Sequence, residues 1–167
     1  MKTYVIMLSK VFPKVHSQEG YSTYFYDKFF LGQNCIGCKG KEADCVFCYG
    51  ELPKIHTIRA NYPLWKTRFE EIKAGKARLS IRQWTGKPYR SKQEEIASLT
   101  ASDGIGIQML SFAPFYTLAV PFVDSRRIAP DAIAANDGLT DADWREWFMH
   151  YDLTQPLAII HFTKFRY

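Results

Sequence analysis

The chain has 167 residues, of which 47% are hydrophobic and 23% charged, values typical of a single globular domain. No apolar run approaches the roughly 18 residues needed to cross a bilayer, and the run at residues 4–8 is too short for a secretion signal. We therefore expect one domain over residues 1–167 of a soluble, cytoplasmic protein that does not enter a membrane.

The net charge of +5 is concentrated in one segment. Residues 54–92 contain eleven Lys or Arg and two acidic residues, Glu70 and Glu71, so this segment carries nine positive charges and the rest of the chain four negative ones. A local excess of basic residues favours a polyanionic partner such as a nucleic acid.

The first predicted elements are a strand and a helix. Residues 4–8 are a short apolar run typical of a buried strand. In residues 22–32, Phe25, Phe29 and Phe30 recur at helical spacing, Ser22 is placed to cap the helix, and Gly32 is placed to end it. We interpret this aromatic stripe as core.

A cysteine-rich insertion is predicted at about residues 33–50. It contains two Cys-x-x-Cys pairs, Cys35 with Cys38 and Cys45 with Cys48. Such paired spacing is typical of a tetrahedral thiolate site for structural zinc, since each pair can direct two sulfurs at one ion. Two disulfides and four free thiols are the alternatives, and a reducing cytoplasm favours zinc over disulfides.

The remaining elements alternate irregularly between strand and helix. We predict strands at residues 54–59, 79–84, 104–110, 116–123 and 157–162, and helices at residues 63–75 and 140–148, with a loop and short helix before the last helix. Because strands are not regularly followed by helices, a parallel doubly wound sheet is disfavoured. The pattern predicts an α+β fold, a small mixed or antiparallel β-barrel with about three flanking helices.

The segment at residues 54–59 carries the most chemistry. Lys54 supplies a point charge, Thr57 a rotating hydroxyl and Arg59 a planar fork, a set that suits an anion or a carbonyl-bearing ligand. His56 lies inside the same segment, where lining a cleft and a structural role are both open. The alternative interpretation is an edge strand whose charges are solvated.

The Lys-x-x-Thr-Ile-Arg pattern, placed after a first strand and an aromatic helix, resembles the motif of ASCH domains of the PUA-like superfamily. The resemblance covers nearly the whole chain outside the cysteine-rich insertion. It implies a PUA-like β-barrel with a basic cleft that holds RNA or a nucleoside. In a bacterial branch of amidohydrolases acting on N4-acetylcytidine, the matching Lys and Thr are catalytic and are joined by a Glu. This chain has no Glu at the matching position, and Asp137 is the nearest carboxylate to that position in the sequence.

A second group of candidate binding residues follows the predicted strand at residues 79–84. Basic, polar and aromatic side chains interleave here, a mixture that suits single-stranded nucleic acid because cations hold phosphates while rings stack on bases. The alternative is a solvated loop with the tryptophan in the core. The candidates are Arg82, Gln83, Trp84, Lys87 and Arg90.

Two functional hypotheses follow, and a third is less specific. The first is a domain that binds RNA or a modified nucleoside through Lys54, Thr57, Arg59 and the second group. The second is an amidohydrolase in which Thr57 is the nucleophile, Lys54 its activator and Asp137 the carboxylate. The third is a protein-interaction domain that uses the cysteine-rich insertion.

Overall fold

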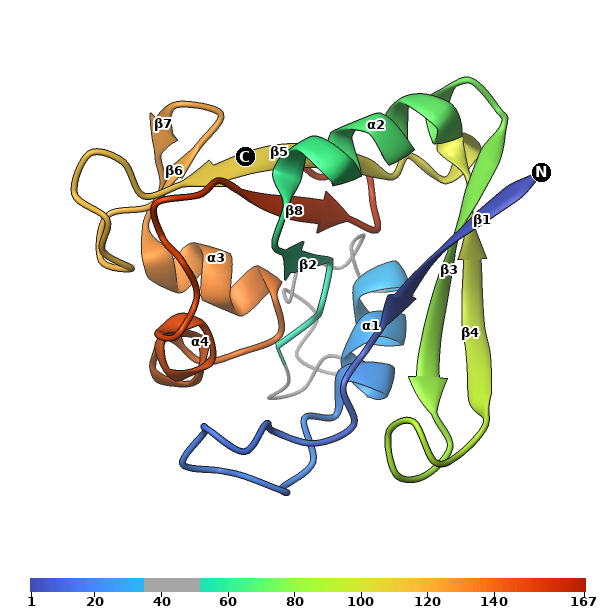
Figure 1. Ribbon diagram of the computed structural model, residues 1–167, viewed down its shortest axis with the longest axis horizontal. Coiled ribbons are helices and arrows are strands. Elements are labelled where there is room, and N and C mark those ends of the chain that lie inside the picture. Colours follow the sequence, from blue (N-terminus) through green and yellow to red (C-terminus); the bar gives the residue numbers. More distant parts are fainter. Residues whose placement is uncertain (35–51) are drawn as a thin grey trace.

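The computed structural model describes residues 1–34 and 52–167, which form an α+β fold with two sheets (Figure 1). The smaller sheet has the order β1-β3-β4. In it β1 pairs with β3 in parallel and β3 pairs with β4 antiparallel. Its strands are β1 (Lys2–Met7), β3 (Ala77–Trp84) and β4 (Gln93–Leu99).

The larger sheet is antiparallel and has the order β2-β8-β5-β6-β7. Its most buried strand is β8, all five residues of which are buried, because β8 lies between β2 and β5. The strands are β2 (His56–Arg59), β5 (Gly106–Ser111), β6 (Phe122–Val123), β7 (Arg126–Arg127) and β8 (Leu157–His161).

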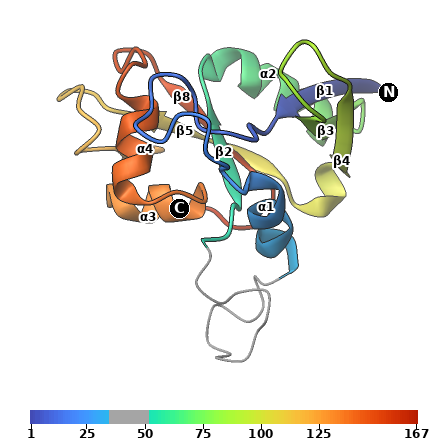
Figure 2. The same cartoon turned by 90° about the horizontal axis from the view of Figure 1, so that it is seen from below.

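Four α-helices and one 3₁₀-helix accompany the sheets in the described part of the chain. They are α1 (Phe25–Asn34), α2 (Tyr62–Lys73), η1 (Ala101–Asp103), α3 (Pro130–Asn136) and α4 (Asp141–Phe148). Figures 1 and 2 both place α3 and α4 on the side of the molecule opposite the β1-β3-β4 sheet, while α2 contacts β3, β5 and β8. Strand β2 and helix α1 lie between these two flanks, while β6 and β7 of the larger sheet lie on the same side as α3 (Figure 1).

Local sequence accounts for the helix ends. The Asn61 side chain accepts a hydrogen bond from the Leu64 amide and Pro63 follows at the start of α2, where its missing amide proton costs nothing. Thr140 accepts from the Asp143 amide at the start of α4. The amphipathic faces that these helices bury, including Phe69 and Trp144, join one hydrophobic core with both sheets.

The strand predicted at residues 116–123 is wrong over most of its length. Residues 113–120 are turns and bends, and only Phe122–Val123 belong to a strand. Tyr116 has a positive φ of 52° and its amide donates to the Phe112 carbonyl, so the backbone turns back on itself here. The strand β4 was not predicted, because its first residues are polar and exposed.

The α+β class is confirmed, and the strands of the described residues form two separate sheets rather than one closed barrel. The PUA-like barrel therefore stays a prediction, as does the single-domain organisation. Within the described ranges, no helix has both the length and the apolar character to span a bilayer. The four cysteines of the zinc prediction, Cys35, Cys38, Cys45 and Cys48, lie outside the described residues.

Candidate functional site

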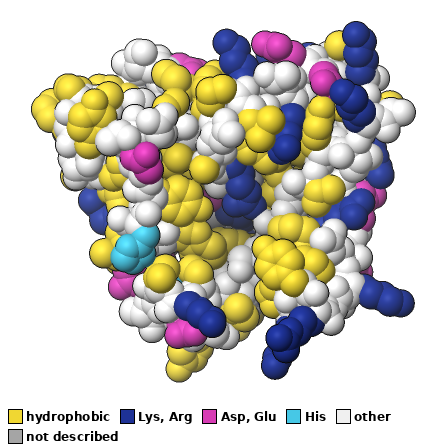
Figure 3. Space-filling view, viewed as in Figure 1, with side chains coloured by type: hydrophobic (Ala, Val, Ile, Leu, Met, Phe, Trp, Pro, Cys, Tyr) yellow, Lys and Arg dark blue, Asp and Glu magenta, His cyan; other side chains and the backbone are white. Residues whose placement is uncertain are grey.

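A pocket opens between β2 and the end of β1, with α1 and α4 on its sides. It comprises about 330 Å³ of empty space, part of which is open solvent. Figure 3 shows a hollow near the middle of this face, with basic atoms inside it and hydrophobic side chains around it. The lining residues are Met7, Leu8, Ser9, Phe25, Lys54, Thr57, Ile58, Arg59, Asp137, Leu139, Trp147 and Phe148.

Strand β2 presents the central part of the motif to this pocket. Among the described strands its partner is β8, in the register Thr57 with Ile160 and Arg59 with Ala158. Because side chains alternate along a strand, Thr57 and Arg59 share one face of β2 while His56 and Ile58 share the other. Thr57 is only 3% exposed, and its hydroxyl makes no hydrogen bond with the described residues.

Lys54 and Asp137 form a buried ion pair at the base of the pocket. The two residues form an isolated antiparallel bridge. Lys54 Nζ donates to the Asp137 carbonyl oxygen at 2.8 Å and to Asp137 Oδ1 at 2.5 Å. It also lies 4.0 Å from the centre of the Phe25 ring, a cation–π contact. Lys54 and Asp137 are 1% and 2% exposed, so this carboxylate and this ammonium are held in place within the protein.

Two glycines allow the backbone to approach Lys54. A Cβ on Gly138 would lie 3.1 Å from Lys54 Cβ, and the φ of Gly138 is +76°, a conformation that favours glycine. A Cβ on Gly32 would lie 2.8 Å from the Lys54 carbonyl oxygen. Lys28 adds a further connection, since its Nζ donates to the Gly138 carbonyl at 2.8 Å. Helix α1 and the turn after α3 thus hold Lys54 from two sides.

Burial shifts the pKa values of the two partners in opposite directions, each toward its neutral form. Burial lowers the pKa of the Lys54 ammonium, and the nearby Asp137 charge opposes this only in part. Burial likewise raises the pKa of the Asp137 carboxyl, against the opposing effect of Lys54. The pair therefore holds one proton for which the two groups compete, which makes Lys54 a stronger candidate base than an exposed lysine.

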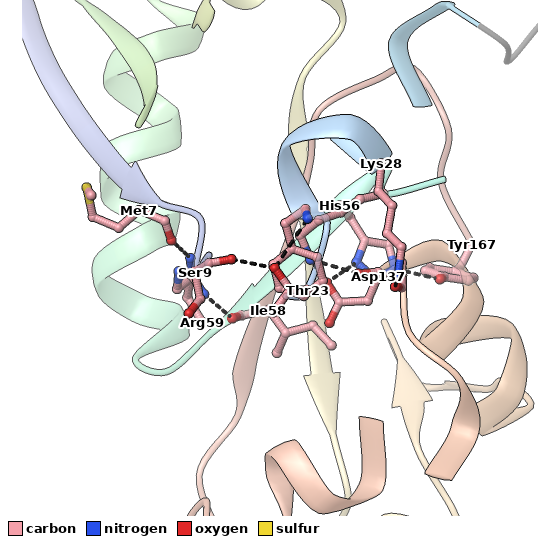
Figure 4. A network of polar contacts seen from close by, with 12 residues as sticks. Met7, Ser9, Thr23, Lys28, His56, Ile58, Arg59, Asp137 and Tyr167 are labelled. Atoms are coloured by element: carbon pink, nitrogen blue, oxygen red, sulfur yellow. Dashed lines mark hydrogen bonds and ion pairs between the residues drawn. The ribbon is translucent and has the colours of Figure 1, made fainter. Parts of the chain in front are cut away.

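Arg59 supplies the half-buried positive charge of the pocket and connects the two sheets. Its Nη2 donates to the Met7 carbonyl at 2.6 Å, and its Nη1 donates to the Ile58 carbonyl at 3.2 Å (Figure 4). Burial lowers the pKa of the guanidinium, but arginine remains charged in proteins. Among the described residues, two of its five N–H groups donate to backbone carbonyls, and Arg59 also lines the pocket.

Behind β2 lies a buried cluster of aromatic and polar rings. His56 Nε2 is 2.8 Å from the Tyr167 hydroxyl, and the rings of His56 and His161 are 5.5 Å apart. Both histidines are fully buried. Burial and the neighbouring rings and cations lower the pKa of His56 well below 6.5, and burial lowers the pKa of His161 to about 3. His56 therefore does not line the pocket but lies directly behind it.

Sequence reasoning missed the aromatic wall of the pocket. Phe25, Trp147 and Phe148 line it, and Phe25 and Trp147 contact each other with ring centres 5.6 Å apart. We interpreted the Phe25 stripe as core, which is correct for Phe29, yet Phe25 serves both the core and the pocket. The apolar residues of α4 did not indicate a pocket, because residues that line a pocket and residues that pack in the core recur at the same helical spacing.

The second group of predicted binding residues does not line this pocket, as far as the described residues go. Lys87 and Arg90 are exposed in the β3–β4 loop, and Gln83 is buried. Trp84 is partly buried and contacts the exposed Tyr89 at a ring distance of 5.3 Å.

Arg82 turns toward its own sheet. Its Nε donates to Ser80 Oγ and its Nη2 lies 3.8 Å from Glu95. It is connected to the pocket through the backbone alone, because it pairs with Met7 in the β1–β3 ladder. We expected the predicted cations to face one cleft. Of these cations, Lys54 and Arg59 line the pocket, and Arg82, Lys87 and Arg90 do not.

Within the described ranges, no three His, Cys, Asp or Glu side chains come together in a way that could hold a metal ion. The pocket is lined by residues suited to acid–base and nucleophilic chemistry: a buried lysine–aspartate pair, a threonine, an arginine and an aromatic wall. Comparisons of the chain with family models, with curated proteins and with solved structures found no match.

Proposed function

We propose that the chain binds a modified nucleoside in this pocket and hydrolyses an amide on its base, as the resemblance to ASCH-type amidohydrolases implies. The observation that carries the proposal is that Lys54, Thr57, Arg59 and Asp137 line one pocket. In this interpretation the two sheets correspond to the two halves of a PUA-like barrel.

The proposed chemistry uses the threonine as the nucleophile. Thr57 Oγ1 attacks the amide carbonyl carbon, and its proton passes to Lys54 when the shared proton of the pair lies on Asp137 and the amine is neutral. The carbon–nitrogen bond then breaks, the base amine leaves with a proton from the Lys54–Asp137 pair, and an acyl ester remains on Thr57. Water attacks this ester by the reverse proton path, which releases the acid and restores the hydroxyl. The shared proton of the buried pair supports this cycle.

The lining of the pocket favours a nucleoside over a folded RNA segment, because apolar rings and a few polar groups face the same space. Phe25 and Trp147 provide apolar ring faces against which a base can pack, and the N–H groups of Arg59 can bind a carbonyl or hydroxyl oxygen.

The test is release of cytidine from N4-acetylcytidine. The native protein should turn the compound over, and Thr57→Val, which removes the hydroxyl but keeps the shape, should abolish turnover while the compound still binds. The matched control is Thr67→Val, on the exposed face of α2, which should leave the rate unchanged. Native protein that binds the nucleoside without releasing cytidine would exclude the hydrolase and leave a binding domain.

A second candidate function, RNA binding, is supported by the β3–β4 loop. Lys87 and Arg90 are exposed beside the Trp84–Tyr89 ring pair, and Tyr89 is 90% exposed. Binding of a single-stranded RNA should weaken as salt rises, and the double variant Lys87→Ala, Arg90→Ala should reduce the slope of log K against log salt by about 1.4, or about 0.7 for each lost phosphate contact. Affinity that does not change with salt would exclude this candidate.

A further inference from the structure

His56 occupies the space between the pocket and the buried ring cluster. Its side chain is fully buried, with Nε2 2.8 Å from the Tyr167 hydroxyl and Nδ1 3.8 Å from Asp137 Oδ1 (Figure 4). Nδ1 has no hydrogen-bond partner among the described residues. A buried polar atom without a partner requires an explanation, because such atoms are rare in folded proteins.

The contacts of Tyr167 favour one position for the proton on His56. Asn136 Nδ2 is 3.0 Å from the Tyr167 hydroxyl and can only donate to it, so this contact uses the hydroxyl as an acceptor. Of the two remaining contacts of this hydroxyl, His56 Nε2 is 2.8 Å away and the Ala132 carbonyl oxygen 3.5 Å away, so we assign the hydroxyl proton to the shorter contact, with His56 Nε2. An Nε2 that accepts a hydrogen bond in a neutral ring leaves the proton on Nδ1.

The resulting Nδ1–H is directed at the catalytic carboxylate. Burial and the proximity of His161 and Lys54 keep the ring of His56 neutral. Asp137 Oδ1 is the acceptor that the structure records near Nδ1, and at 3.8 Å the contact is longer than a hydrogen bond. Contacts of this kind in a ligand-free site shorten when substrate binds. The same oxygen accepts a hydrogen bond from Lys54 Nζ, and His56 Nδ1 lies 3.8 Å from it.

We propose that His56 is a positioning residue, which uses an Nδ1–H fixed by Tyr167 to orient the Asp137 carboxylate toward Lys54. The proposal rests on the proposed function, since it names how the pair that activates Thr57 is held in place. It assigns the unpartnered nitrogen a role that a purely structural histidine would not have, and it adds Tyr167 and Asn136 as the groups that set the tautomer.

The first experiment measures the tautomer directly and does not depend on activity. Nitrogen-15 NMR of the imidazole rings in the native protein should show His56 neutral with the proton on Nδ1 at pH 7. The variant His56→Asn, which lacks this signal, assigns it. Tyr167→Phe should shift His56 toward the Nε2–H form, which free histidine prefers in water. A native His56 with its proton on Nε2, or with both nitrogens protonated, overturns the proposal.

The second experiment measures hydrolysis of N4-acetylcytidine. His56→Asn keeps an N–H donor near the position of Nδ1 and should retain most of kcat. His56→Leu removes the donor and should lower kcat by about 10-fold to 100-fold with little change in KM, the size expected for misplaced catalytic groups. Equal losses of kcat in both variants would overturn the positioning role, and urea unfolding of each variant shows whether it is folded.

The two proposals fail in different ways. Native protein that has the Nδ1–H tautomer but releases no cytidine refutes the hydrolase and leaves the His56–Asp137 arrangement standing. Native protein that releases cytidine with His56 in the Nε2–H form refutes the positioning role and leaves the hydrolase standing.

Discussion

Removing one member of the Lys54–Asp137 pair should destabilise the whole protein. Lys54→Met keeps the length of the side chain but leaves a carboxylate with 2% exposure without its partner cation. Loss of one partner from a buried pair costs about 3–5 kcal/mol, because the remaining charge is neither solvated nor neutralised. For a chain of this length, 1 kcal/mol corresponds to about 2–4 °C in Tm, so Tm should fall by about 6–20 °C.

A double-mutant cycle separates this effect from lost packing. Lys54→Met with Asp137→Leu replaces the pair by apolar side chains of similar size and should recover most of the free energy of unfolding measured by urea titration. Lys2→Met, at an exposed pair with Glu71, is the matched control and should leave the midpoint unchanged. Additive losses in the double variant, or a Lys54→Met midpoint equal to that of the native protein, would refute a charged, coupled pair.

Three further predictions concern neighbouring groups. The pKa of His161 is about 3 in the folded state and 6.5 in the unfolded chain, so the unfolded chain takes up the proton first and the free energy of unfolding falls as pH drops. Between pH 6.5 and 5 this residue should lower the free energy of unfolding by about 2 kcal/mol. His161→Phe should remove this contribution in urea titrations at several pH values. Gly32→Ala should cost about 1–3 kcal/mol in urea unfolding because its Cβ meets the Lys54 carbonyl, whereas Gly86→Ala, whose Cβ meets nothing nearer than 3.4 Å, should cost less. Thr57→Val should leave the free energy of unfolding within about 1 kcal/mol of the native value, since its hydroxyl has no partner among the described residues.

The elements with strong periodicity were predictable from the sequence. The α2 and α4 helices have capping residues and apolar faces, and β3 alternates between buried and partly exposed residues over most of its length. The prediction failed where composition and tertiary context disagree. β4 begins with polar residues but pairs with β3, and the apolar segment 116–123 turns because the chain reverses direction near Tyr116.

The candidate site was predictable in part, through local spacing. The Lys54–Arg59 segment indicated a ligand site. Asp137 was identified as the carboxylate nearest in sequence to the position where the resemblance implies a Glu. Its contact with Lys54 joins residues 83 positions apart, which no local pattern encodes. The buried positions of His56 and Tyr167 were equally inaccessible, because a single histidine and a single tyrosine give no periodic signal. The basic residues of the β3–β4 loop were predicted to bind a ligand together with the Lys54 segment, but they do not line this pocket, because the direction of the loop depends on the sheet.

The order of pairing in the larger sheet has a consequence for how the site is made during synthesis. Strand β2 carries Thr57 and Arg59, yet its ladder partner among the described strands is β8, about a hundred residues later. A nascent chain that has emerged only as far as α2 contains Lys54 and Thr57 but neither β8, which pairs with β2, nor Asp137, which contacts Lys54. Assembly of the pocket is thus a late event that waits until β8 has left the ribosome.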